Sequence, residues 1–321
     1  MQVSFEAYVT AVAFDAAGQA LFALGDGSVR GEAGEAVQAH EGAVLAAALH
    51  PSGQGLVTGG DDGRLVWTRD GESQALAALP GKWLDVVATS AASGLIAFGA
   101  GRELHVRDAA DPAFARVFAH ERTVADAAFE PKGRRIAVAS YGGAWLWYAR
   151  IEAQKPARLE WAGSHVACAW SPDGRFLISA MQENALHGWR VADEKNMRMG
   201  GYPAKPKSLV FLSKGALLAT SAASGVVVWP FAGATGPMGK QAAEVGYDEA
   251  SAVVRVAAAP APSLVAAGLD DGRVWVCDLS GEKLTPLKAE KGEAVSALAM
   301  SADGRRVAWG CEDGQAGVAD L

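Results

Sequence analysis

The sequence has few of the residues that build disulfide frameworks. Its three cysteines, Cys168, Cys277 and Cys311, are scattered, odd in number and without CxxC spacing. This pattern argues against a disulfide-rich secreted domain and favours a reducing, cytoplasmic location. Long apolar runs are also missing, since none approaches the roughly 18 to 20 residues needed to span a bilayer. No basic start followed by an apolar run indicates a secretion signal, so we expect neither a membrane association nor export.

The chain also lacks an excess of positive charge. Its 29 Lys and Arg residues are outnumbered by 36 Asp and Glu residues, which gives a formal net charge of -7 at pH 7. Binding to nucleic-acid phosphates depends on clustered lysine and arginine side chains. The charge balance therefore argues against a nucleic-acid partner.

Signatures of catalysis are missing as well. The sequence contains no GxSxG, no P-loop and no HExxH motif. Asp-Gly pairs begin at Asp26, Asp62, Asp271 and Asp313. At such positions Asp bonds its own backbone and Gly adopts a positive φ, so we interpret these pairs as turns. We predict no catalytic residues, no cofactor and no enzymatic activity.

What the sequence does contain is one pattern repeated eight times. The copy from Val9 reads VTAVAFDAAGQALFALGDGSV, and the copy from Val295 reads VSALAMSADGRRVAWGCEDGQ. A turn at the same place in each copy marks the register, at Gly18, Gly53, Gly94, Gly133, Gly174, Gly215, Ser263 and Gly304. A period near 40 residues is typical of propeller and solenoid repeats. The longest spacing between these turns, from Gly215 to Ser263, contains a Gly- and Ala-rich segment from Phe231. We expect this segment to be a surface excursion or an extended strand.

Each repeat contains short runs of β-branched and aromatic residues bounded by Gly and Asp, which is typical of strands and hairpins. We expect fourth strands at residues 35–38, 74–79, 114–118, 157–161, 196–200, 241–245 and 284–288. The eighth repeat stops after its third strand, while residues 2–6 form a spare strand. Pairing of this spare strand with the C-terminal sheet would close a ring and protect its strand edges.

The predicted fold is therefore all-β, a single closed β-propeller domain of four-stranded antiparallel blades over residues 1–321. The repeat count predicts eight blades, with seven as the alternative. The closing strand occupies residues 1–7, and the repeat units occupy residues 8–38, 39–79, 80–118, 119–162, 163–201, 202–246, 247–289 and 290–321.

Two units carry a family resemblance. The unit from His40 reads HEGAVLAAALHPSGQGLVTGGDDGRLVWTRD, and the unit from His165 reads HVACAWSPDGRFLISAMQENALHGWR. Both resemble WD40 repeats, and the turns at residues 171–174 (SPDG) and 301–304 (SADG) are similar to the turn of that family. The resemblance extends over essentially the whole chain and implies a non-enzymatic scaffold that docks proteins. The richness in alanine suggests a bacterial source with a GC-rich genome.

The WD40 resemblance also implies a buried tetrad of Asp, His, Ser or Thr, and Trp in each blade, which is incomplete here. Unit two retains His40, Thr58 and Asp62, but its Trp67 stands one position early, which would turn the ring to the opposite face of the strand. Unit five retains His165 and Trp189 with Glu183 in place of the Asp, and His120 has no acidic partner in its own turn. We therefore expect stability to come mainly from apolar packing, with most tryptophans in the core.

Charged residues near the central channel form a second candidate site. On the first, innermost strands the position three before the last apolar residue holds Asp85, Asp126 and Arg255, whereas other units have Ala or Ser there. Because an unpaired buried charge is costly, these groups either face channel water, pair with neighbours or hold a small ion or ligand. The histidines lie on different units, and lone His and Cys side chains are usually packing residues, so we predict no metal site.

The resemblance places partner contacts on one rim, formed by the loops before the first strands and between the second and third strands. The corresponding residues are Tyr8, Lys82, Trp83, Arg122, Tyr141, His165, Gln182, Glu183, Lys207, Asp270 and Glu312. Lys82, Trp83, Arg122 and Tyr141 fall on adjacent units and include the residue types that dominate binding hot spots. The alternative is that Trp83 packs between units and the rest are merely solvated.

Two interpretations of function follow. The first is a scaffold or adaptor, monomeric in solution, that docks a protein or peptide on its rim. The alternative is a propeller that binds a small ligand or metal ion, or acts as an enzyme, through its channel charges.

Overall fold

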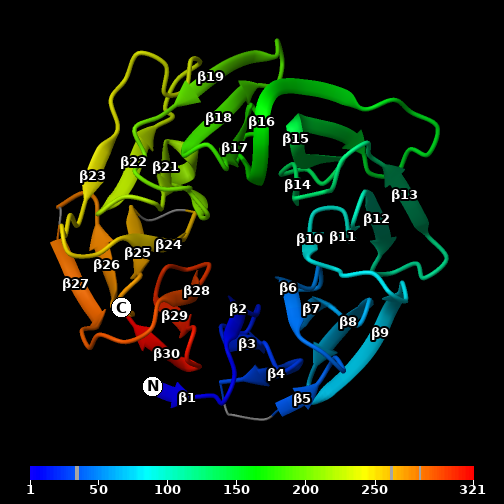
Figure 1. Ribbon diagram of the computed structural model, residues 1–321, viewed down its shortest axis with the longest axis horizontal. Helices are drawn as coiled ribbons and strands as arrows, with labels where there is room; N and C mark the ends of the chain where they lie inside the picture. The colour runs from blue at the N-terminus through cyan, green and yellow to red at the C-terminus, as the bar shows by residue number, and fades with distance from the viewer. Residues whose placement is uncertain (33–35, 261–262, 282) are drawn as a thin grey trace.

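A computed structural model describes residues 1–32, 36–260, 263–281 and 283–321 of the chain. These residues form a closed ring of antiparallel sheets around a central axis (Figure 1). The elements are the strands β1 to β30 and one short 3-10 turn, η1 (Ser213–Gly215). Within the described residues no helix has the length and apolar character to cross a membrane.

Three four-stranded sheets lie in the first third of the ring. From the channel outward their strands are β2 (Val9–Phe14), β3 (Ala20–Leu24), β4 (Ser28–Gly31) and β5 (Ala36–Gln38); β6 (Val44–Leu49), β7 (Leu56–Gly60), β8 (Arg64–Arg69) and β9 (Glu72–Ala78); and β10 (Val86–Ser90), β11 (Leu95–Ala100), β12 (Glu103–Asp108) and β13 (Ala115–Ala119).

One six-stranded sheet follows, with β14 (Asp126–Phe129), β15 (Arg135–Tyr148), β16 (Ala157–Trp170), β17 (Phe176–Met181), β18 (Ala185–Arg190) and β19 (Lys195–Met199). The remaining four-stranded sheets contain β20 (Leu209–Leu212), β21 (Leu217–Thr220), β22 (Val226–Pro230) and β23 (Ala243–Val245); β24 (Val253–Ala258), β25 (Leu264–Leu269), β26 (Val274–Asp278) and β27 (Lys283–Lys288); and β28 (Val295–Met300), β29 (Arg306–Cys311), β30 (Gln315–Asp320) and β1 (Gln2–Ser4).

The sheet count corrects the expectation of eight separate blades. Counted by hydrogen-bonded sheets, the described residues form seven blades, the alternative number, because units four and five share the six-stranded sheet. The joint is β16, whose first part pairs with β15 and whose second part pairs with β17. A 14-residue strand thus replaces the loop that separates the other units. The ring therefore holds eight sequence repeats in seven sheets.

The predicted strands otherwise agree with the structure to within about two residues. The predicted outer strand at 74–79 is β9 (Glu72–Ala78), and the one at 241–245 is the shorter β23. Residue 35, the first of the predicted strand 35–38, lies outside the described residues.

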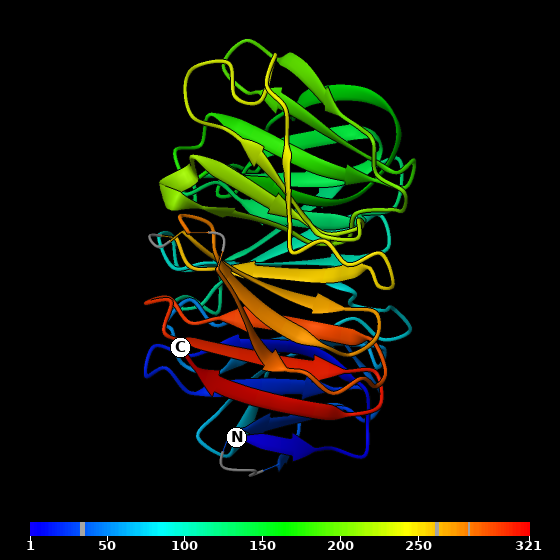
Figure 2. The same ribbon diagram turned by 90° about the vertical axis from the view of Figure 1, so that its left-hand side faces the viewer.

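The N-terminal strand closes the ring. β1 pairs antiparallel with β30, with Val3 opposite Ala316, and Figure 2 shows this strand beside the last strands of the chain. The Met1 ammonium donates to the Val318 carbonyl over 2.6 Å. Phe5, which follows β1, is buried against Phe22 of the first unit with ring centroids 5.4 Å apart. The closing segment therefore joins the first and last units through both backbone pairing and core packing.

The hydrophobic core is divided into clusters between consecutive repeat units. Units four and five, which share a sheet, also share one of these clusters, in which Leu146 and Leu159 of one unit lie with Trp170 and Trp189 of the other. Five of the ten tryptophans are buried and four are half-buried at these junctions, in line with the expectation that most pack in the core; Trp83 is exposed. Burial of such large apolar surfaces between units stabilises the ring without a single central core.

Candidate docking rim

The rim is built by a repeated backbone contact between neighbouring units. The loop before β10 docks on the turn after β7, where Leu84 N donates to Gly60 O over 3.1 Å. The loop before β14 docks in the same way on the turn after β11, where Val124 N donates to Gly101 O over 2.8 Å. The predicted rim residues before the first strands therefore lie on the same face of the ring as the turns between second and third strands.

Burial of one residue in each loop turns its neighbour outward. Leu84 is fully buried, and the adjacent Trp83 is 68% exposed. Ser140 is buried and donates to Thr123 O over 2.8 Å, and the adjacent Tyr141 is 60% exposed. Consecutive side chains of an extended backbone point to opposite sides, which explains both pairs. Packing of Trp83 between units, the alternative considered above, does not occur.

Ten of the eleven predicted rim residues are exposed: Tyr8, Lys82, Trp83, Arg122, Tyr141, Gln182, Glu183, Lys207, Asp270 and Glu312. The exception is His165, which is 0% exposed and cannot touch a partner. Its buried position suits the tetrad role that the sequence also gave it.

The four residues Lys82, Trp83, Arg122 and Tyr141, here called the docking cluster, combine two exposed rings with two cationic side chains. Among the described residues no carboxylate lies within salt-bridge distance of Lys82 or Arg122; the ion pair in this region joins Arg158 and Glu121 at 3.4 Å. Aromatic and arginine side chains supply most of the binding energy in protein interfaces.

A buried polar network occupies the predicted tetrad position in unit two. The His40 ring contacts Asp62 Oδ1 through Nδ1 at 3.0 Å and Thr58 Oγ1 through Nε2 at 2.8 Å. Burial raises the pKa of Asp62, but hydrogen bonds from His40 and from the amides of Arg64 and Glu41 outweigh burial and lower it overall. The network therefore holds an ionised carboxylate at the rim.

Trp67 lies outside this network. Its Nε1 donates to Gln54 O over 2.9 Å, and its ring stacks on His50 with centroids 3.9 Å apart. The one-residue shift of Trp67 in the sequence accounts for this placement, because alternate residues of a strand face opposite sides.

Unit five has a reduced network. His165 contacts Ser179 Oγ through Nδ1 at 2.7 Å and Trp161 O through Nε2 at 3.1 Å, and its ring lies 5.5 Å from that of Trp189. The Glu183 carboxylate accepts from Ser164 N over 3.0 Å instead of reaching the imidazole.

Unit four has no corresponding polar network. His120 lies edge-on to Trp145 and Trp147, with its Nε2 buried and without a hydrogen-bond partner. Burial lowers the pKa of His120 to about 4, so the imidazole is neutral at pH 7.

Unit six contains a network that the sequence analysis missed. Trp229 Nε1 donates to the Tyr202 hydroxyl over 2.7 Å, and that hydroxyl contacts Thr220 Oγ1 at 2.6 Å. Thr220 Oγ1 in turn donates to Val227 O over 3.2 Å. Tyr202 replaces the family's histidine, and the available signal was a Thr on the second strand, Thr220, together with a Trp on the third strand, Trp229. Burial raises the pKa of Tyr202 to about 12.

Two of the three channel charges contact a neighbouring inner strand. Asp126 on β14 accepts from Cys168 N over 2.8 Å, and Arg255 Nε on β24 donates to Ser296 O over 2.7 Å. Burial raises the pKa of Asp126 to about 6 and lowers that of Arg255. Asp85 precedes β10 and is exposed. The three groups lie on different units, and the described residues bring together no three His, Cys, Asp or Glu side chains able to hold a metal.

Two family models match parts of the chain. The model described as WD domain, G-beta repeat matches residues 34–67 and 159–190, and the model of the anaphase-promoting complex subunit 4 WD40 domain matches residues 257–321. No curated protein matches the sequence.

Solved structures show the same fold at low sequence identity. The computationally designed Ika8 protein superposes with a TM-score of 0.79 at 19% identity, covering 99% of this chain and 98% of that one. The β-propeller domain of Cps50 (Swd1) from Myceliophteria thermophila superposes with a TM-score of 0.69 at 14% identity, covering 87% of this chain and 97% of that one.

Proposed function

Because the chain is a WD40-repeat β-propeller, we propose that it is a non-catalytic scaffold that docks a protein or peptide partner on its rim. The observation that carries this proposal is the docking cluster, in which Trp83 and Tyr141 expose 68% and 60% of their surfaces on neighbouring units. Exposed aromatic rings are favourable to bury in an interface, and arginine side chains commonly join them there.

The charge of the cluster supports a partner surface that is acidic around an apolar centre. Lys82 precedes Trp83 in the chain and Arg122 lies in the same unit as Tyr141, while the overall net charge of -7 disfavours general attraction of acidic proteins. Recognition would therefore depend on local complementarity, with Trp83 as the central anchor and Arg122 paired to a carboxylate of the partner.

The test is affinity capture from native cell extract, with the wild-type chain compared with a Trp83→Ala/Arg122→Ala variant. We expect the wild type to retain a protein that the variant loses, with dissociation constants differing by at least about 100-fold. Lys195→Ala, on the outer strand β19 and away from the rim, is the matched surface control.

The same capture assay tests the alternative function through the channel. A variant carrying Asp85→Asn, Asp126→Asn and Arg255→Gln retains the partner if docking is on the rim. Loss of partner in this variant, with retention in Trp83→Ala/Arg122→Ala, would contradict the scaffold proposal and favour a channel ligand.

The proposal includes a monomer in a reducing cytoplasm, with neither nucleic acid nor membrane as partner, and a bacterial source. Burial of Cys168, Cys277 and Cys311 is compatible with a reducing compartment, since buried thiols are protected from oxidation. Size-exclusion chromatography with light scattering would test the monomer.

A further inference from the structure

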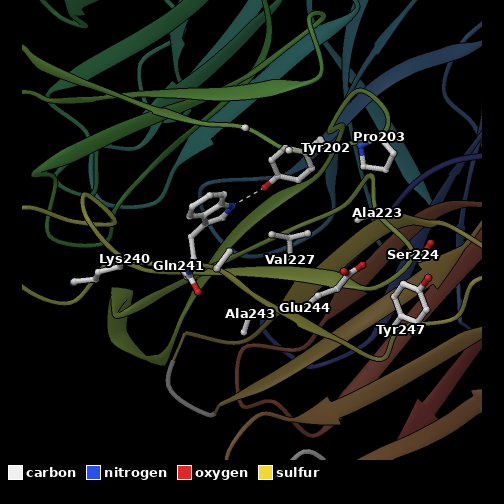
Figure 3. A pocket seen from close by; sticks show the side chains of 14 residues that line it. Tyr202, Pro203, Ala223, Ser224, Val227, Lys240, Gln241, Ala243, Glu244 and Tyr247 are labelled. Atoms are coloured by element: carbon white, nitrogen blue, oxygen red, sulfur yellow. Dashed lines mark hydrogen bonds between the residues drawn. The ribbon is translucent and has the colours of Figure 1, made fainter.

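A pocket with a volume of about 590 Å³ opens on unit six, away from the docking cluster on units three and four. Its lining comes from three places in the chain: residues 200–203 after β19, residues 223–229 around β22, and residues 240–247 around β23 (Figure 3). Pockets of this size bind small molecules or two to three side chains of a peptide. The pocket is open to solvent rather than enclosed, which suits an extended segment.

The outer wall of the pocket is formed by an insertion in the repeat. The segment between β22 and β23 is the longest insertion in the repeat pattern, and it runs along the outside of the ring beside β19 (Figure 1). It is held against unit five, where Arg190 Nη1 donates to Ala234 O over 3.1 Å. Lys240 Nζ donates to Ala232 O over 2.6 Å and ties the insertion to itself.

The floor of the pocket presents carbon rather than polar atoms. Val227 and Trp229 of β22 lie beside Tyr202 and Pro203. The polar atoms of Trp229 and Tyr202 are bonded to each other at 2.7 Å and, through the Tyr202 hydroxyl, to Thr220 at 2.6 Å. Because these groups are satisfied internally, the exposed ring surfaces can bury an apolar side chain without leaving a donor unpaired.

One side of the pocket carries an unpaired negative charge beside an exposed ring. Figure 3 shows Glu244 and Tyr247 together with Ser224 on this side, and Lys240 and Gln241 on the other. Glu244 Oε1 accepts from Gly225 N over 2.7 Å, which fixes the carboxylate in place. No cation among the described residues lies within salt-bridge distance of Glu244, and Tyr247 is 64% exposed.

Gly225 makes this arrangement possible. A Cβ atom at residue 225 would lie 2.7 Å from Val245 O and 2.8 Å from Glu244 Cγ. Any larger residue would therefore push β23 and the Glu244 side chain away from the turn before β22. The close approach places a fixed carboxylate and a phenol ring next to an apolar floor, which matches a cationic side chain adjoining an apolar one.

From this geometry we propose that the unit-six pocket binds a short extended peptide segment in which a lysine or arginine adjoins a large apolar residue. The apolar side chain packs on Val227 and Trp229, and the cation lies between the Glu244 carboxylate and the Tyr247 ring. This site is separate from the docking cluster and does not depend on the proposed rim function.

The experiment is selection of a random heptapeptide phage library on the immobilised full-length chain, followed by fluorescence polarisation with labelled synthetic peptides of the selected sequences. We expect selected peptides to share Lys or Arg next to Leu, Ile, Met or Phe. Glu244→Gln, which keeps an acceptor for Gly225 N, should weaken binding about five- to tenfold, and Tyr247→Ala about threefold. Replacing the peptide's lysine by glutamate should abolish binding to the wild type and restore part of it to Glu244→Lys.

Trp83→Ala is the matched control, because it removes an exposed aromatic ring from the docking cluster and leaves unit six intact. The proposal is overturned if no peptides are enriched, if enriched peptides lack a basic residue, or if Glu244→Gln changes affinity by less than twofold. Peptides that bind Glu244→Gln normally but are lost in Trp83→Ala would overturn the pocket while supporting the rim. Thermal melting of each variant confirms that a loss of binding is not a loss of fold.

Discussion

Units two and six bury the same kind of polar network with different side chains. In unit two, an imidazole links Thr58 to an ionised carboxylate, with contacts of 2.8 and 3.0 Å. In unit six, an indole and a phenol perform the linking, and Trp229, Tyr202 and Thr220 form a chain with contacts of 2.7 and 2.6 Å. One network contains a charge, and the other is neutral.

The comparison shows which contact of the tetrad recurs from unit to unit. A second-strand hydroxyl contacts a third-strand carbonyl in both units, from Thr58 to Val66 O at 3.3 Å and from Thr220 to Val227 O at 3.2 Å. Unit five has the same contact from Ser179 to His187 O at 3.2 Å. The hydroxyl must be satisfied because it is buried, whereas its other partner can be His or Tyr. In unit six, the network residues Tyr202 and Trp229 also line the floor of the pocket.

The largest effect is expected from His40→Ala in unit two. Removing the imidazole takes one hydrogen bond each from the buried Thr58 hydroxyl and the Asp62 carboxylate and leaves a cavity, so we expect the free energy of unfolding to fall by about 3 kcal/mol. Urea denaturation at pH 7 measures this change. The control is His120→Ala, which removes an imidazole whose Nε2 has no hydrogen-bond partner and should cost about 1 kcal/mol. Equal losses in the two variants would mean that packing alone, not the network, stabilises unit two.

Tyr202→Phe should break the neutral network of unit six and lower the free energy of unfolding by less than His40→Ala does. The ring remains, but Trp229 Nε1 and Thr220 Oγ1 lose their shared partner, so we expect a loss of about 2 kcal/mol. A double-mutant cycle with Trp229→Phe should give a coupling energy of about 1 kcal/mol. Tyr247→Phe, which alters an exposed tyrosine that lines the same pocket, should leave stability unchanged. A coupling near zero would contradict the chain of hydrogen bonds.

These two networks also show what the sequence could predict and what it could not. The repeat period predicted the ring, its outer strands and its closure by the N-terminal strand, because each depends on local turn and strand patterns. It did not predict that units four and five share a sheet, since the continuity of β16 (Ala157–Trp170) depends on pairing with strands on both sides. The spacing between the turns at Gly133 and Gly174 is the same as between several other consecutive repeats, so it gives no sign of the shared sheet.

The candidate sites also include features that the sequence predicted and features that it did not. The exposure of Trp83 and Tyr141 follows from their place beside buried loop residues, which the family resemblance located. The resemblance placed His165 both on the rim and in the buried tetrad. Its burial conflicts with the rim assignment and suits the tetrad. The unit-six pocket combines three separated segments with a tyrosine in a histidine position, so no local motif pointed to it.

The charge difference between the two networks predicts different responses to acid. The pKa of Asp62 in the folded chain is below its ordinary value of 3.8, so its stabilising contribution is present above that pH and is lost as the pH falls through the folded-state pKa. The destabilisation by Asp62→Asn, about 1 kcal/mol at pH 7, should therefore shrink as the pH falls below about 4. Denaturation series from pH 7 to pH 3 test this dependence. The effect of Tyr202→Phe should stay constant over the same range, because its pKa of about 12 lies far outside it.

The smallest effect is expected from Trp67→Phe, and it sharpens the contrast between the tryptophans of the two units. Trp67 is half-buried beside the cluster between units two and three, where a phenyl ring can still stack on His50 and contact Arg69, so the main loss is the bond from Nε1 to Gln54 O. We expect a change of about 0.5 kcal/mol or less by urea denaturation. Trp229→Phe should cost at least about twice as much, because its Nε1 bonds the Tyr202 hydroxyl of the unit-six network. If Trp67→Phe were the more damaging change, the stacked pair with His50 would be the main support of unit two, and the His40 network would be secondary to it.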